Sequence, residues 1–210
     1  MATDALLALL RTEGWRPAAW ARFVGLAGER SLREAARRPR ALVEVSVLHG
    51  AALVVGRGRG RWWTTTSWTL AVAHLGMLEG RRSLGPANAL SLSRALLPVA
   101  GDGLGRWVGV VAVASDLADG QLARRRGCVT PFGAYADSLA DAAFWTWLTV
   151  RHEPSRVVRA AALALWTLPV GAIAVASLAR GQLIERPHPA VLRPAAAMQA
   201  LVALRRLARS

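Results

Sequence analysis

The segment Asp116–Asp141 reads DLADGQLARRRGCVTPFGAYADSLAD and carries four of the six aspartates in the chain. Asp116 and Asp119 are three residues apart, and Asp137 and Asp141 are four residues apart, so on helices each pair projects from one face. The apolar residues around both pairs predict two helices, and the short linker at 124–132 makes these helices antiparallel neighbours. We therefore expect the four carboxylates to converge on one site.

Four carboxylates in a poorly hydrated site repel one another or take up protons unless cations lie between them. An intramembrane cluster of ionisable residues is by default a candidate functional site. The segment offers oxygen ligands and places no histidine or thiolate among them. Such a ligand set favours a hard cation, and we expect Mg²⁺ or Mn²⁺.

Small residues lie one helical turn from the aspartates, namely Gly120, Ala123 and Gly133. They leave an open slot beside the carboxylates, although close packing of membrane helices also favours small residues. Arg124 is predicted at the mouth of this slot, where a cation faces a metal-bound anion. The combination suits a diphosphate, and divalent metals that bridge a diphosphate are typical of phosphoryl-group transfer.

The composition indicates a membrane protein. Of the 210 residues, 53% are apolar and 19% are charged, and the mean hydropathy is +0.29, whereas soluble domains carry about 25% charge. All 27 basic residues are arginine, which gives a net charge of +14. Because these arginines punctuate apolar segments and form no continuous basic face, the distribution argues against a nucleic-acid partner. The single cysteine, Cys128, excludes an internal disulfide and a thiolate metal cluster.

The chain divides into two predicted parts. Residues 1–40 mix apolar and charged residues, which predicts one or two amphipathic helices on the membrane surface or, equally, a small soluble helical cap. Ser31 and Glu34 have the spacing of a capping box that opens a helix. Residues 41–210 form the predicted transmembrane domain. Its apolar segments are 41–56, 64–79, 88–104, 105–123, 132–151, 156–179 and 188–204.

Several of these segments are shorter than the roughly 20 residues of a spanning helix. The predicted fold class is therefore all-α, a polytopic integral membrane bundle of about six transmembrane helices with an amphipathic N-terminal juxtamembrane segment. With a cytoplasmic N-terminus, 17 arginines fall on the cytoplasmic side and 10 on the other. This bias predicts a multi-pass protein of the cell (inner or plasma) membrane whose aspartate site faces the cytoplasm.

The aspartate segment fits D-x2-D-G-x2-A-R-x8-G-x3-D-x3-D at every fixed position, and in this it resembles the signature of the CDP-alcohol phosphatidyltransferases (class I). Upstream, Asn88, Ser91 and Arg94 in PANALSLSR resemble the weaker N-x-L-T-x-x-R element of that family, with serine in place of threonine. The resemblance covers about 85–205, and residues 1–84 show no match to the family.

The resemblance implies roles for nine residues. A pair of divalent ions, Mg²⁺ or Mn²⁺, would be held by Asp116, Asp119, Asp137 and Asp141. Of these, Asp141 would close the site and act as the general base. The CDP group would be bound by Asn88, Ser91, Gly120, Ala123 and Arg124. Within that set, Gly120 and Ala123 would admit the nucleotide, and Arg124 would bind the diphosphate.

The resemblance also implies an activity and partners. An acceptor hydroxyl would attack the phosphorus distal to cytidine in CDP-diacylglycerol or another CDP-alcohol, and CMP would leave. The expected partners are this CDP-alcohol, an acceptor alcohol and membrane lipids, with a possible homodimer and no nucleic acid. The family core has six membrane helices. Here two apolar segments follow the signature where the family has three, so either the C-terminal half is shorter or helices at 41–79 replace the missing one.

Two other functions are compatible with carboxylates in a membrane. The chain could be a non-catalytic paralogue that binds divalent metal and CDP-lipid, or an ion transporter. All four aspartates are present, which favours an enzyme because a binding protein needs no general base. A transporter would need broken helices at its midplane, which the sequence does not indicate. No motif identifies the acceptor alcohol.

Overall fold

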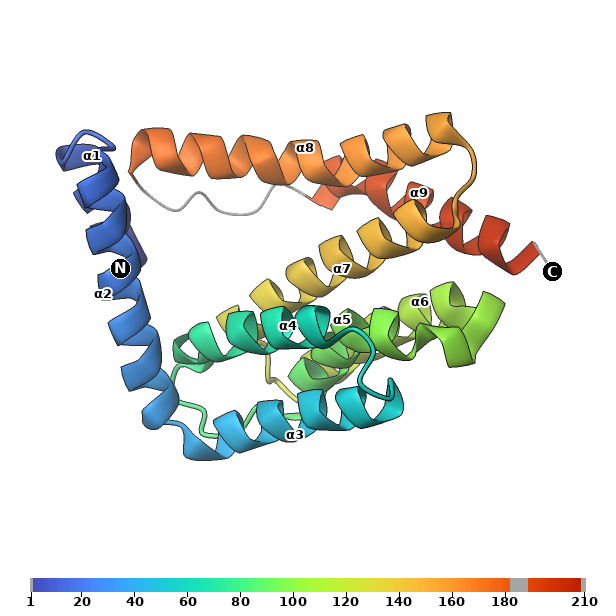
Figure 1. Cartoon of the computed structure of the whole chain (residues 1–210), viewed down its shortest axis with the longest axis horizontal. Helices are drawn as coiled ribbons and strands as arrows, with labels where there is room; N and C mark the ends of the chain where they lie inside the picture. The colour runs from blue at the N-terminus through green and yellow to red at the C-terminus, as the bar shows by residue number, and fades with distance from the viewer. Residues whose placement is uncertain (1, 182–188, 209–210) are drawn as a thin grey trace.

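The computed structural model describes residues 2–181 and 189–208, and within these ranges it contains helices and no strand (Figure 1). The predicted all-α class is therefore confirmed. The α-helices are α1 (Ala2–Thr12), α2 (Pro17–Ala36), α3 (Pro39–Val55), α4 (Arg61–Ala73), α5 (Pro86–Leu104), α6 (Val108–Arg125), α7 (Pro131–His152), α8 (Arg156–Arg180) and α9 (Pro189–Ala208). Two 3-10 helices, η1 (Leu75–Leu78) and η2 (Gly105–Trp107), precede α5 and α6.

Local sequence signals set the helix ends. A proline at the first turn opens α2, α3, α5 and α7, where its missing N–H costs nothing and its fixed φ suits the helix. Thr130 caps α7, because its Oγ1 accepts a hydrogen bond from the Gly133 N–H at 3.0 Å. Ser155 caps α8 in the same way, and Gly181 ends α8 with a positive φ of 64°.

The helices α1 and α2 lie within the N-terminal segment for which one or two helices were predicted, and α2 runs across one end of the longer helices (Figure 1). The predicted capping box is wrong, because α2 continues through Ser31 instead of starting there. The Ser31 hydroxyl donates instead to the Ala73 carbonyl at 2.9 Å. Glu34 pairs with Arg38, and this hydrogen bond lowers the pKa of the Glu34 carboxyl. Arg38 also donates to the Glu79 carbonyl at 2.8 Å, which ties the α2–α3 junction to the end of η1.

Two apolar clusters form the interior. The first joins α2, α3, α4, η1, α5 and the start of α7, and it includes Leu75 and Phe132. The second joins α6, α7, α8 and α9, and it includes Val108 and Phe144. Along α7, the two aspartates lie between residues of the first cluster and Phe144 of the second. The polar site thus lies between two apolar cores.

Of the helices in the described ranges, α8 alone is long and apolar enough to cross a membrane by length and composition. The predicted number of about six spans is therefore not confirmed. α3 has 17 residues and α4 has 13, both short of the roughly 20 that a straight span needs. α6 and α7 each carry two aspartates. The start of the predicted segment 188–204 lies outside the described residues, and α9 begins at Pro189.

The helices at 41–79 pack beside the signature helices, since α3 and α4 both contact α5. Glu44 on α3 has no contact with the four signature aspartates among its described partners. Its carboxylate accepts hydrogen bonds from the Ser83 hydroxyl at 2.8 Å and from the Leu84 N–H at 2.6 Å. Glu44 therefore anchors the turn that leads into α5, and with it the start of the nucleotide-binding element that the sequence predicted.

Candidate functional site

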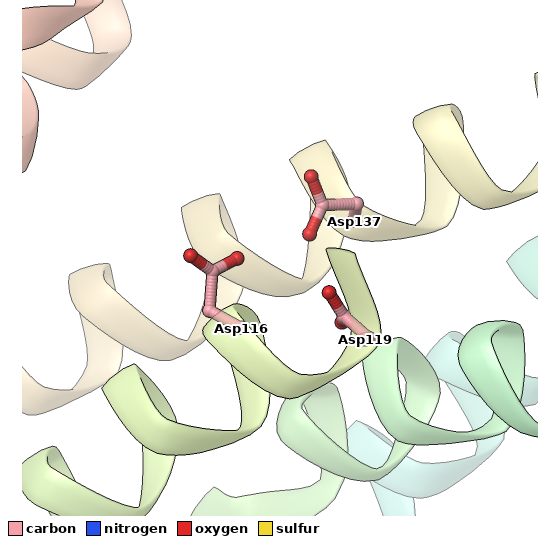
Figure 2. Close-up of side chains that lie close together, drawn as sticks. All are labelled: Asp116, Asp119 and Asp137. Atoms are coloured by element: carbon pink, nitrogen blue, oxygen red, sulfur yellow. The ribbon is translucent and has the colours of Figure 1, made fainter. Parts of the chain in front are cut away.

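The aspartates converge beside α5, against which both α6 and α7 pack. α6 presents Asp116 and Asp119, and α7 presents Asp137 across from them (Figure 2). One carboxylate oxygen from each of these three residues lies within 4.8 Å of the other two. The spacing argument from the sequence therefore placed these side chains correctly, and three oxygen ligands lie within reach of a single cation.

The side chain of Arg94 on α5 contacts all four carboxylates. Its Nη2 lies 3.3 Å from Asp116 Oδ1, its Nη1 lies 3.0 Å from Asp119 Oδ2, and its Nε lies 2.7 Å from Asp141 Oδ1. Nη2 also pairs with Asp137. The Arg94 side chain is fully buried. The expectation that divalent ions alone supply the counter-charge is thus corrected, because a side chain supplies part of it.

Arg94 is a site residue that was not predicted from the sequence. Arg94 appeared only as the last residue of the weak N-x-L-T-x-x-R element, and the chain holds 27 arginines. The available signal was its position: it lies inside an apolar run, three residues after Ser91, and therefore on the same helix face. A cation on that face at membrane depth needs an anionic partner.

Asp119 is the most enclosed of the four aspartates, with 7% of its side chain exposed. Its Oδ2 accepts hydrogen bonds from the Ser91 hydroxyl at 2.7 Å and from Arg94 Nη1. Asp116 and Asp137 are more open, with 46% and 37% of their side chains exposed. The carboxylates of these two residues are therefore the more accessible ones for an ion or a substrate.

A cavity of about 260 Å³ lies between α5, α6 and α7 beside the aspartates. Its lining contains two of the aspartates, Asp119 and Asp137. It also contains all five residues that the resemblance assigned to the CDP group, which are Asn88, Ser91, Gly120, Ala123 and Arg124. The structure thus brings together, around one cavity, residues from three consecutive helices.

Thr130 is a part of this site that sequence reasoning missed. Besides capping α7, its hydroxyl accepts a hydrogen bond from Asn88 Nδ2 at 3.4 Å, and the same Nδ2 donates to the Leu84 carbonyl at 2.7 Å. A Cβ on Gly133 would overlap Asn88 Oδ1. Gly133 therefore allows the close approach of α7 to α5 that fixes Asn88. A threonine before a helix-opening proline was the signal for the cap.

Two further cavities flank the site. One, of about 430 Å³, adjoins it at Asn88 and Cys128 and is lined by Arg81, Arg82 and Arg126. The other, of about 360 Å³, lies between α4, α5 and α7, and its lining is largely apolar and includes no aspartate. We place the chemistry at the smaller, polar cavity because only there do carboxylates and the signature residues share one wall.

The family model of the CDP-alcohol phosphatidyltransferases matches residues 86–207, which is more than half of the chain. The chain belongs to this family. No curated protein and no solved structure matched the chain. The match begins with α5 and extends into α9, so it agrees with the predicted extent of 85–205. The helices α1 to α4 lie outside the matched region.

We predict that Gly133→Ala displaces Asn88 and lowers the free energy of unfolding by about 1–3 kcal/mol, because the added methyl group has no space. Thermal unfolding of the purified protein measures this change. Gly171→Ala on α8 is the matched control: its Cβ would meet nothing within 4 Å, so this variant should be as stable as wild type or slightly more stable. Equal stability of the two variants would contradict the close approach of α5 and α7.

Proposed function

We propose that this protein transfers a phosphatidyl or similar substituted phosphate group from a CDP-alcohol such as CDP-diacylglycerol to the hydroxyl of an acceptor alcohol, and releases CMP. The observation that carries the proposal is the junction of α5, α6 and α7, where an aspartate cluster opens into a cavity lined by the signature residues. Membership of the family supports the reaction class.

The donor set fits the divalent metals that this reaction class uses. The ligands are carboxylate oxygens, which suit Mg²⁺ and Mn²⁺. Arg94 brings one positive charge to four carboxylates, so the ionised cluster stays anionic and still attracts cations. Asp116, Asp119 and Asp137 would hold two ions. When bound, these ions would neutralise the diphosphate and make its phosphorus more electrophilic.

The remaining residues of the cavity would position the nucleotide. Arg124 is exposed at its edge, where its guanidinium would pair with the diphosphate of the CDP-alcohol. Asn88 is buried and held by Thr130, so it offers a fixed amide toward the nucleotide. Gly120 and Ala123 carry minimal side chains on the same wall, which leaves room for the ligand.

Asp141 is our candidate for the general base. In the reaction, the acceptor oxygen forms a bond to the phosphorus distal to cytidine, the bond between that phosphorus and the CMP oxygen breaks, and the hydroxyl proton must be taken up. Asp141 Oδ1 is buried beside Arg94 and has no hydrogen-bond partner. An acceptor hydroxyl would supply that missing donor and then give up its proton there.

We further propose that the protein is a multi-pass membrane protein whose site faces the cytoplasm. α8 meets the criteria for a span. Several valines on α3 and α8 are exposed, including Val54 at 78%, Val157 at 78% and Val175 at 67%. Such apolar surfaces are costly in water and favourable in lipid. The possible homodimer stays a prediction.

The test of the proposed function is CMP release from CDP-diacylglycerol by the purified protein in lipid vesicles, with a panel of acceptor alcohols and Mg²⁺ or Mn²⁺. We expect release with at least one acceptor, loss of release in excess EDTA and recovery on addition of metal. Undiminished turnover in EDTA would contradict the metal proposal. Binding of CDP-diacylglycerol without CMP release for every acceptor would instead support the non-catalytic paralogue.

The roles of two aspartates can be separated. Asp141→Asn should reduce the rate of CMP release by at least about two orders of magnitude, because asparagine keeps the shape but cannot take the proton. Binding of CDP-diacylglycerol should fall much less, since the three clustered aspartates are intact. Asp116→Asn should lose binding and turnover together. Near-normal turnover of Asp141→Asn would show that the base lies elsewhere, and loss of all metal binding would show that Asp141 is mainly a ligand.

Cys128 is a natural probe of orientation and of the nucleotide cavity. It is half-buried in the α6–α7 linker and lines the cavity beside Arg124. A membrane-impermeant thiol reagent should label it in inverted vesicles and spare it in intact cells, and CDP-diacylglycerol with Mg²⁺ should slow the labelling. Labelling of Cys128 in intact cells would show that the site faces the outside of the cell and not the cytoplasm. Unchanged labelling with saturating CDP-diacylglycerol would place the nucleotide elsewhere.

A further inference from the structure

One feature of the site is not used by the proposed reaction. Arg94 is fully buried, comes from α5, and contacts carboxylates of α6 and α7 at the same time. The oxygens that it touches belong to the three clustered aspartates that would hold metal, and to Asp141. A guanidinium and a divalent ion would therefore draw on the same carboxylates.

We propose that Arg94 is a built-in counter-ion of the metal site: it holds the four aspartates together before metal binds, and it competes with the metal for their oxygens. Arg94 is on this view a positioning residue that sets metal affinity. The inference rests on the proposed function, because it assumes that the aspartates bind the metal.

Charge explains the holding role. Three aspartates whose oxygens lie within 4.8 Å of one another, one of them enclosed, repel one another when ionised. Arg94 Nη1 lies 3.0 Å from the enclosed Asp119, and its Nη2 pairs with Asp137 on the neighbouring helix. Hydrogen bonds between charged groups of this kind are among the strongest in proteins. The metal-free site is thereby kept in the geometry that a metal requires.

Burial explains the competing role. The Arg94 side chain has no exposed surface, so it cannot swing into solvent when an ion enters. The incoming cation must share the carboxylates with a positive charge that stays close by, and like charges at such distances disfavour each other. Removal of the guanidinium should therefore increase the affinity for metal and lower the stability of the metal-free protein.

The experiment measures Mn²⁺ affinity by titration and electron paramagnetic resonance, and thermal unfolding with and without Mn²⁺, in variants purified with Mn²⁺ and then stripped. Arg94→Met should lower the unfolding temperature of the metal-free protein by at least about 5 °C. It should also lower the Mn²⁺ dissociation constant by about tenfold or more. Arg94→Lys keeps the charge without the planar fork, so its dissociation constant should stay within about threefold of wild type.

Arg205→Gln is the matched control. Arg205 Nε on α9 lies 3.0 Å from Oε2 of the buried Glu153, which directly follows α7. This ion pair lies away from the four aspartates. This variant also removes an arginine from a buried carboxylate, so it should lower the unfolding temperature equally with and without Mn²⁺ and leave the dissociation constant unchanged. A change in Mn²⁺ affinity in Arg205→Gln as large as that in Arg94→Met would overturn the proposal.

Wild-type protein supplies an independent measurement should Arg94→Met fail to fold. In a ¹⁵N-arginine spectrum, the Nε–H signal that is absent from Arg94→Lys belongs to Arg94, and Mg²⁺ should shift it. An unshifted signal at saturating Mg²⁺ overturns the competition, as does unchanged or weaker Mn²⁺ binding in Arg94→Met. Absence of any Mn²⁺ binding to wild type would instead remove the metal part of the proposed function, so the two failures are distinguishable.

Discussion

The contact of one buried arginine with four carboxylates is the interaction on which the rest of this structure depends. Arg94 links α5 to α6 and α7 through ion pairs, at a point where the three helices meet through charged side chains and not through apolar ones. Removing one partner of a buried charge pair is strongly destabilising, because the other charge is left uncompensated. The two apolar clusters then have a fixed junction between them, with the first on the α3 side and the second on the α8 and α9 side.

Around this junction, small and capping residues turn a charge cluster into a binding site. Gly133 lets α7 approach α5 closely, and Thr130 both starts α7 and holds Asn88. Gly120 leaves its wall of the cavity free except for the guanidinium of Arg124, which lies 3.2 Å from where its Cβ would be. The signature thus combines ligands, space and helix geometry in one segment, which is why it can be recognised in a single sequence.

Much of this was predictable because the determining signals are local. Aspartates three and four residues apart must share a helix face, and the aspartates of α6 and α7 do converge, although the two helices pack mainly on α5 instead of on each other. The apolar segments located most of the helices. Arg94 was not predicted as the partner of the four aspartates, because its contacts join residues that are distant in the sequence. The chain also holds 27 arginines, and residue type alone does not distinguish Arg94 from the others. The capping-box prediction was wrong because Ser31 lies inside the continuous helix α2, where its hydroxyl donates a hydrogen bond to the Ala73 carbonyl. The predicted number of membrane spans was not confirmed either. Some of the predicted spans are short helices, and α6 and α7 each carry two aspartates within their apolar sequence.

We infer that the aspartate cluster would hold a metal ion beside the diphosphate of a CDP-alcohol. The most direct measurement is the hyperfine coupling between protein-bound Mn²⁺ and the ³¹P nuclei of added CDP. Our account predicts a strong ³¹P coupling in the wild-type protein and its loss in Asp119→Asn, whose side chain lies in the wall of the nucleotide cavity. Bound Mn²⁺ that shows no ³¹P coupling at saturating CDP would contradict it.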